Sequence, residues 1–265
     1  HFDHNNGAIA YKEAFPDITV ISERESQKYI ELNGVWWSQM CVAQNSTKRA
    51  SLADKEKALN QGINEMGQPY SAAELDNLRK VIAQRKNELT ELNGLKIVTP
   101  DKTFSGSLTI DLGKKKVLLT DYVRANSPHD VAFYLPEDQV LFTGDMLVQS
   151  PLPYVGASWP VTWAAHLREL EKIPVKALIP GHGPVQKDHA YTRLMREFLE
   201  SAAQQTEKMI REGKTLEQIQ KAIDLSTFKR GPWQGGTQEF KDDWAQNSNV
   251  LVERLWRCIR GQGGI

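Results

Sequence analysis

The stretch His1-Phe2-Asp3-His4 opens the chain and places two imidazoles and a carboxylate within four residues. Neutral imidazole and carboxylate are the usual ligands of catalytic zinc. Two later stretches end apolar runs and carry side chains of the same kind, Phe142-Thr143-Gly144-Asp145 and Ile179-Pro180-Gly181-His182-Gly183. Loops that follow strands allow a rigid sheet to direct several side chains at one point. Alone, the first stretch fits a solvated tail equally well, but the three together predict a site for a divalent metal.

The order and context of these stretches resemble the metallo-β-lactamase superfamily. Its first motif reads His-x-His-x-Asp-His, and this sequence starts at the second histidine, with Asn6-Gly7-Ala8 continuing the match. The resemblance extends to about residue 190. It implies an α/β fold, the four-layer αβ/βα sandwich, with the first part of the N-terminal half missing. We therefore interpret residues 1–265 as one N-terminally incomplete domain, and expect residues 1–265 alone to be poorly soluble or oligomeric because a sheet edge would be exposed.

Apolar periodicity and turn residues predict the elements along the chain. Two capping boxes are expected at helix starts, Ser22 with Glu25 and Ser71 with Glu74. Residues 45–93 are interpreted as a helical insertion that walls or covers a substrate cleft, and residues 189–265 as a C-terminal helical region. The predicted helices are 6–15, 22–32, two within 48–93, 159–173, 189–212, 216–223 and 238–260, and the predicted strands are 18–21, 96–98, 106–112, 116–120, 131–135, 140–142 and 177–179.

The resemblance also implies a role for each ligand, because the family binds up to two metals in one cleft. It assigns His1 to the first metal position. It assigns Asp3, His4 and His182 to the second, and it makes Asp145 a bridge between the two. In the family the motif-one aspartate also orients the nucleophile or relays its proton, so Asp3 is the predicted catalytic residue.

The turn from Arg124 to Asp130 departs from the family pattern, which commonly reads His-Thr-Pro-Gly-Asp. Asn126 stands where the family has a ligating histidine. An amide oxygen is a poorer zinc donor than an imidazole, so we expect one zinc rather than two. His129, three residues further on, is a candidate replacement for the missing third histidine. The alternative, a surface histidine in a tight turn, is favoured by the direction of the turn's backbone. Asp130 is expected to brace the turn.

Composition narrows the choice of partners. Lys plus Arg and Asp plus Glu are both 33, which argues against an extended nucleic-acid-binding face. No run of about eighteen apolar residues is present, so no membrane span is expected. Cys41 and Cys258 have no metal-binding spacing and are interpreted as ordinary thiols. A small-molecule substrate is the expected partner, while the oligomeric state and the compartment stay open.

The function implied by the resemblance is that of a metal-dependent hydrolase. Zinc lowers the pKa of bound water to about seven, and the resulting hydroxide attacks an ester, thioester, amide or related bond. Two alternatives stay open: a β-lactamase that hydrolyses β-lactam antibiotics, and a catalytically degenerate scaffold that binds a ligand or partner through the old cleft. The aromatic and proline-rich segment 146–163 is either an apolar wall of the substrate site or a packing loop.

Overall fold

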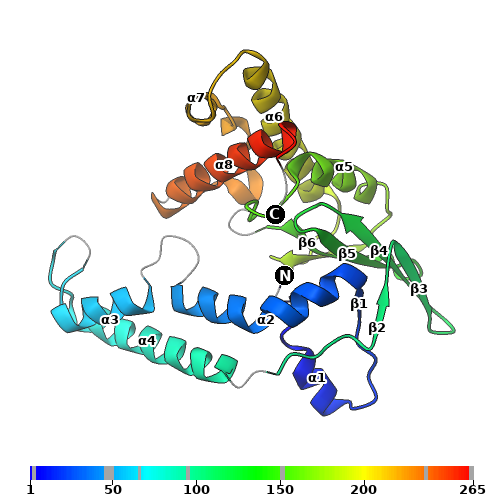
Figure 1. Cartoon of the computed structure of the whole chain (residues 1–265), viewed down its shortest axis with the longest axis horizontal. Coiled ribbons are helices and arrows are strands. Elements are labelled where there is room, and N and C mark those ends of the chain that lie inside the picture. The colour runs from blue at the N-terminus through cyan, green and yellow to red at the C-terminus, as the bar shows by residue number, and fades with distance from the viewer. Residues whose placement is uncertain are drawn as a thin grey trace. The chain divides into compact units, whose positions relative to one another are not determined.

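The computed structural model describes residues 1, 4–44, 51–64, 67–93, 96–149, 153–235 and 238–262. These residues form two compact units, His1–Thr103 and Phe104–Ile265, which are described separately (Figure 1). No helix among the described residues is both long and apolar enough to cross a bilayer.

The first unit is mainly helical. Helix α4 packs against both α2 and α3, and the short strands β1 and β2 pair in a two-stranded sheet. Polar and charged residues dominate α3 and α4, and Ile82 is the buried residue of α4. The elements are α1 (Ala8–Ala14), β1 (Ile21–Glu23), α2 (Arg24–Gln44), α3 (Leu52–Gln61), α4 (Ala72–Asn93) and β2 (Lys102–Phe104).

Helix α2 begins in a different way from the sequence-based prediction. The buried carboxylate of Glu23, and not the hydroxyl of Ser22, accepts the backbone N–H groups of Glu25 (2.7 Å) and Ser26 (2.9 Å). A carboxylate satisfies two free donors at once and lies favourably at the positive end of the helix. The second predicted capping box is confirmed, because Ser71 and Glu74 exchange hydrogen bonds at the start of α4.

The predicted strand 96–98 does not form, and β2 lies four residues beyond it at Lys102–Phe104. Only the last residue of the predicted strand 18–21 lies in β1. Side-chain contacts hold the rest of this run, since Lys12 Nζ donates to the Ile18 carbonyl (2.7 Å) and the N–H of Val20 donates to the Asp101 carboxylate (2.7 Å). Among the described residues, backbone pairing there is limited to the Val20 carbonyl, which accepts the N–H of Asp101 (2.8 Å) and that of Lys102 (3.2 Å). A short β-branched run that pairs at one carbonyl gains little from strand propensity alone.

The second unit is built on a five-stranded sheet in the order β3-β4-β5-β6-β7. Strands β3 to β6 are antiparallel, and β7 pairs parallel to β6 after a crossover through α5. The strands are β3 (Ser107–Asp111), β4 (Lys116–Val123), β5 (His129–Leu135), β6 (Val140–Val148) and β7 (Ala177–His182). The helices are α5 (Pro160–Leu170), α6 (Ala190–Arg211), α7 (Leu216–Ala222) and α8 (Gln238–Ile259), with 3-10 turns at Ser226–Phe228 and Gly231–Trp233.

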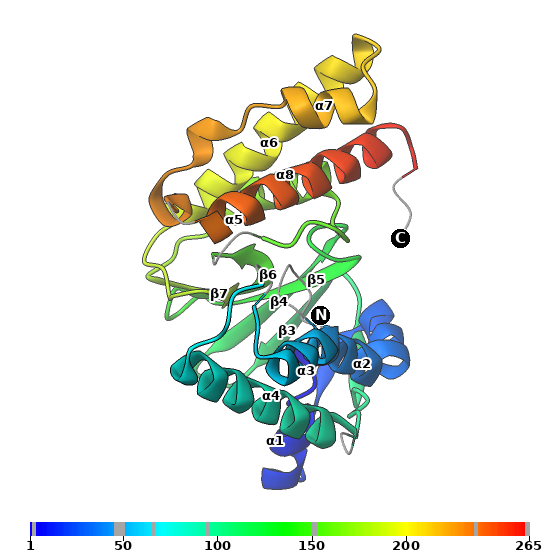
Figure 2. The ribbon, with the colours of Figure 1, turned by 90° about the vertical axis from the view of Figure 1, so that its left-hand side faces the viewer.

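Helices α5, α6 and α8 lie together on one side of this sheet (Figure 2). The sheet contributes Leu141 and Leu178 to the core between them, and α5 contributes Trp163, whose indole N–H donates to the Met146 carbonyl (3.2 Å). Removing this apolar surface from water is the main stabilising contribution.

The candidate ligands Asn126, Asp145 and His182 lie towards one end of the sheet, which we refer to as the site end. Val123 pairs with His129 across β4 and β5, and Val148 pairs with His182 across β6 and β7. Since β5 runs antiparallel to β6, the turn 124–128 and the final residues of β6 and β7 lie at this same end.

The site-end strands are longer than predicted. Asp145 lies inside β6 and His182 is the last residue of β7, so neither residue lies in a loop past its strand. Register shifts between Phe142 and Val148 allow β6 to continue through its polar residues. Such bulges bend a strand and redirect individual side chains.

Candidate metal site

Asp145 is held close to the neighbouring strand. Its side chain is 8% exposed, and a Cβ atom at Gly181 would lie 2.1 Å from Asp145 Oδ1 and 2.7 Å from the Gly144 carbonyl carbon. Only glycine leaves room for this approach. Gly144 itself has φ +51, a left-handed conformation that side chains disfavour. The two glycines therefore fix where the carboxylate lies.

His182 faces the same carboxylate. Its Nε2 lies 3.5 Å from Asp145 Oδ1, and its side chain is 46% exposed. Two ligands about 2.1 Å from a tetrahedral zinc are separated by roughly 3.4 Å, so this distance suits two donors to one ion. The N–H of Gln149 donates to the His182 carbonyl (2.9 Å), which holds the backbone in place.

Gly183 continues this tight packing with φ +113, and an added Cβ would lie 2.7 Å from Gln149 Cβ. Gln149 Oε1 in turn accepts from Gln186 Nε2 (3.0 Å). Glycine is therefore required on both sides of His182, because a side chain at position 181 or 183 would clash with neighbouring atoms.

Asn126 lies in the turn between β4 and β5 and is 1% exposed. Its Nδ2 donates to the Tyr154 carbonyl (2.8 Å), while its Oδ1 is buried without a hydrogen-bond partner among the described residues. The turn is strained at Arg124, where φ is +60, and is braced by Asp130, which accepts the N–H of Ser127 (2.7 Å).

His129 has a partner within the sheet. Its Nδ1 lies 3.1 Å from both carboxylate oxygens of Asp121 on β4, and that carboxylate is 3% exposed. This contact favours the interpretation of His129 as a structural residue. One weak signal for this pairing is visible in the sequence, namely the charged residue Asp121 within the otherwise largely apolar strand β4. Two further histidines also contact backbone carbonyls, His166 at Val123 (2.8 Å) and His189 at Ile173 (2.8 Å).

The N-terminal candidates belong to the first unit. His1 and His4 are both exposed there, and the His4 N–H donates to the His1 carbonyl (3.3 Å) in a tight turn. Asp3, the predicted catalytic residue, lies outside the described residues. The structure brings Asp145 and His182 together, and the convergence of His1, Asp3 and His4 on the same ion stays a prediction.

Comparison with known proteins gives a family match over most of the chain. The model of the metallo-beta-lactamase superfamily matches residues 1–205. A linear primary-alkylsulfatase of Pseudomonas sp. is 23% identical over 241 residues, which are 87% of this chain and 42% of that protein. The chain therefore spans less than half the length of this curated relative.

Solved structures resemble parts of the chain. A stereoselective inverting sec-alkylsulfatase of Pseudomonas sp. is matched with a TM-score of 0.47 and 16% identity, over 60% of this chain and 27% of that one. A metallo-beta-lactamase of Pontibacter korlensis is matched with a TM-score of 0.35 and 22% identity, over 42% of this chain and 53% of that one.

Proposed function

We propose that this chain, which belongs to the metallo-beta-lactamase superfamily, is a metal-dependent hydrolase. We further propose that its substrates are sulfate esters. Members of this superfamily are mostly hydrolases. The observation that carries the metal-dependent part is the pair of Asp145 and His182, 3.5 Å apart at the site end of the sheet. The substrate class is supported by the similarity to an alkylsulfatase over 87% of the chain.

The residues present fit a divalent ion. A carboxylate and an imidazole are borderline-hard donors that suit zinc, and their separation is that of two ligands on one tetrahedral ion. Asp145 and His182 would hold the ion together with Asp3 and His4 of the first motif, and His1 would serve a second ion. When bound, zinc supplies a Lewis acid and lowers the pKa of water towards neutrality.

The described residues contribute orientation. Gly181 fixes the position of the Asp145 carboxylate, and Gln149 fixes the backbone at His182. Preorganised donors need no rearrangement at the moment of reaction, which is how a rigid sheet contributes to catalysis. Asp3 is the residue that we propose orients the attacking water and accepts its proton.

Asn126 supports a single tight zinc. Its amide N–H group is engaged with the Tyr154 carbonyl, which leaves only an amide oxygen at the position where the family has an imidazole. An ion at the first metal position would then have few strong donors, whereas the second position keeps a complete set in the sequence.

The test is a substrate panel with purified, zinc-loaded protein. We expect a linear alkyl sulfate to release inorganic sulfate, measured by ion chromatography, with loss of turnover after chelation and recovery on adding zinc. Asp145→Asn is the matched variant, because it keeps the shape of the side chain and removes its charge.

Each other outcome identifies a different function. Turnover of a chromogenic cephalosporin without sulfate release would make the protein a β-lactamase. Turnover of carboxylic esters or thioesters alone would keep the hydrolase and reject the sulfate ester. Zinc binding with no turnover of any member of the panel would favour the degenerate scaffold.

A further inference from the structure

Arg254 of α8 is a buried cation that lacks an acidic partner among the residues the structure describes. Its side chain is 7% exposed. Its Nε donates to the Ser158 carbonyl (2.9 Å), and the guanidinium carbon lies 5.4 Å from the centre of the Trp159 ring. Nη2 is enclosed and has no hydrogen-bond partner. A buried guanidinium with an unused donor is costly, so the Arg254 site calls for an explanation.

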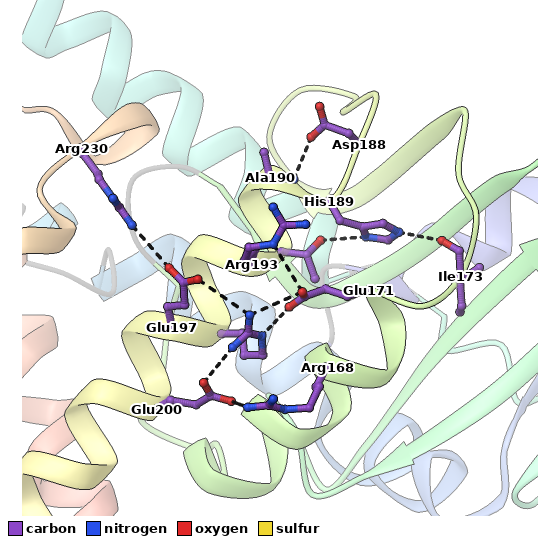
Figure 3. A network of polar contacts seen from close by, with 12 residues as sticks. Arg168, Glu171, Ile173, Asp188, His189, Ala190, Arg193, Glu197, Glu200 and Arg230 are labelled. Atoms are coloured by element: carbon purple, nitrogen blue, oxygen red, sulfur yellow. Dashed lines mark hydrogen bonds and ion pairs between the residues drawn. The ribbon is translucent and has the colours of Figure 1, made fainter.

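The rest of the unit shows how this chain usually accommodates such a group. Arg196 on α6 is also largely buried, but its guanidinium pairs with the carboxylates of Glu171 and Glu200 (2.8 Å to the latter). Figure 3 shows Glu171 and Glu200 in a network that also includes Arg168 and Arg193. The buried guanidinium of Arg196 is therefore neutralised by carboxylates, whereas that of Arg254 has none among the described residues.

The N-terminus of α5 lies directly beside Arg254. Helix α5 starts at Pro160, and its N-cap residue Trp159 makes no side-chain capping bond. The first turn also holds no acidic residue. The leading N–H groups of a helix and its dipole attract negative charge, and capping side chains normally satisfy this demand. Arg254 reaches this helix end through Ser158 and Trp159, the two residues that precede it.

Cys258 of α8 and the turn of Arg124 adjoin the same region. Burial raises the pKa of the Cys258 thiol on α8, while the positive charges of Arg254 and Arg124 lower it. Arg254 lies four residues before Cys258 on the same helix. The strained turn of Arg124 is joined to the start of α5, because the N–H of Trp159 donates to the Ala125 carbonyl (2.9 Å).

We infer that the N-terminus of α5, together with Arg254, forms a binding site for an oxyanion of the sulfate class. Pro160 has no N–H and the N–H of Trp159 is bonded to Ala125, so the helix end supplies the N–H groups of Val161 and Thr162. Arg254 supplies a guanidinium donor and a fixed charge. The site contains none of the proposed metal ligands, so it does not depend on the proposed hydrolysis. It also lies partly in α8, beyond the residues that the family model matches.

The first test is thermal unfolding with increasing sodium sulfate, at an ionic strength held constant with sodium chloride. Because binding to the folded state alone raises stability by mass action, the unfolding midpoint should rise with the logarithm of the sulfate concentration once sulfate exceeds the Kd. Arg254→Gln should lose this rise and keep only the general stabilisation that sulfate gives to folded proteins. Arg257→Gln is the matched control, since Arg257 lies on the same helix, is 53% exposed and pairs with Glu253, and it should respond like the wild type.

Further experiments distinguish loss of anion binding from a folding defect, and a free inorganic anion from the sulfate group of a substrate. Arg254→Lys keeps the charge at the same place and should retain a weaker response to sulfate, which guards against a trivial folding defect in Arg254→Gln. Protein stripped of metal by a chelator should bind sulfate as well as zinc-loaded protein does. Sodium phosphate and a short alkyl sulfate, titrated in parallel by calorimetry, distinguish a free inorganic anion from the sulfate group of a substrate.

A second measurement follows Cys258 in a Cys41→Ser background. Bound sulfate neutralises the nearby positive charge, so the thiolate fraction at pH 8 should fall and alkylation by iodoacetamide should slow by about threefold, the effect of half a pKa unit. The inference is wrong if sulfate changes neither the midpoint nor the alkylation rate beyond the chloride control. It is equally wrong if Arg254→Gln responds to sulfate as the wild type does.

Discussion

Residue 181 has room only for glycine, and the reason is the carboxylate of Asp145. We expect Gly181→Ala to weaken zinc binding by about 10- to 100-fold, the range found when a group that orients a metal ligand is lost. The physical cause is the 2.1 Å contact that the new Cβ would make with Asp145 Oδ1, which forces the carboxylate away. Competition with a fluorescent zinc chelator measures the change.

Gly106→Ala is the control for this substitution. Gly106 has φ +72 with open space around it, so alanine there costs about 1 kcal/mol of stability from backbone strain alone. Zinc affinity should be unchanged in this variant. An equal loss of zinc in both variants would attribute the effect to general destabilisation and would remove the special role of Gly181.

Asn126 determines the expected metal content. We predict about one tight zinc per chain, with Asn126→His raising the count towards two because imidazole is the better donor. Asn126→Leu, which fills the buried space without a donor, should stay at one. Elemental analysis after dialysis gives the count. Two tight zinc ions in the unmodified protein would contradict the role proposed for Asn126.

At the scale of single elements, the start of α2 is capped either by the Glu23 carboxylate, as the structure shows, or by the Ser22 hydroxyl, as the sequence predicted. Glu23→Ala should destabilise the first turn of α2 by about 1 kcal/mol, since two backbone N–H groups lose their acceptor. Ser22→Ala should have little effect, because the Ser22 hydroxyl donates to the Glu23 carbonyl and accepts no helix N–H in the described structure. Amide hydrogen exchange at residues 25–28 distinguishes the two variants, and similar protection in both would contradict this assignment.

Elements with strong periodic patterns were predictable, and those set by distant partners were not. The apolar alternation of β4 and β5 and the amphipathic pattern of α6 come from local sequence and predicted these elements within a few residues. The continuation of β6 through Asp145 depends on bulges against β7, which no local pattern encodes. The candidate site divides in the same way. The sequence motifs predicted Asp145 and His182 as site residues. The contact of Asp121 with His129 and the position of Arg254 beside Ser158 could not be predicted, because they arise only when distant segments pack.

On the scale of the whole molecule, the second unit depends on helices beyond the family-matched residues 1–205. Leu251 and Leu255 of α8 are fully buried in the same core as Leu141 and Leu178 of the sheet. The strands that carry Asp145 and His182 therefore share a core with the C-terminal helix. A defect in α8 should reach the site end through this core, because close-packed interiors transmit strain.

Leu255→Ala tests this dependence. We expect a loss of about 2–5 kcal/mol in the free energy of unfolding of residues 104–265, the usual cost of a leucine-sized cavity. Urea unfolding followed by tryptophan fluorescence measures it, since Trp163, Trp233 and Trp244 all lie in this core. Zinc release should occur in the same transition, because β6 and β7 lose their support when the core opens. Lys241→Ala, an exposed change on the same helix, should alter the free energy of unfolding by less than about 0.5 kcal/mol. Zinc retained through the main unfolding transition of Leu255→Ala would show that the site end is stable without α8, and the helical region would then be an appendage to the fold.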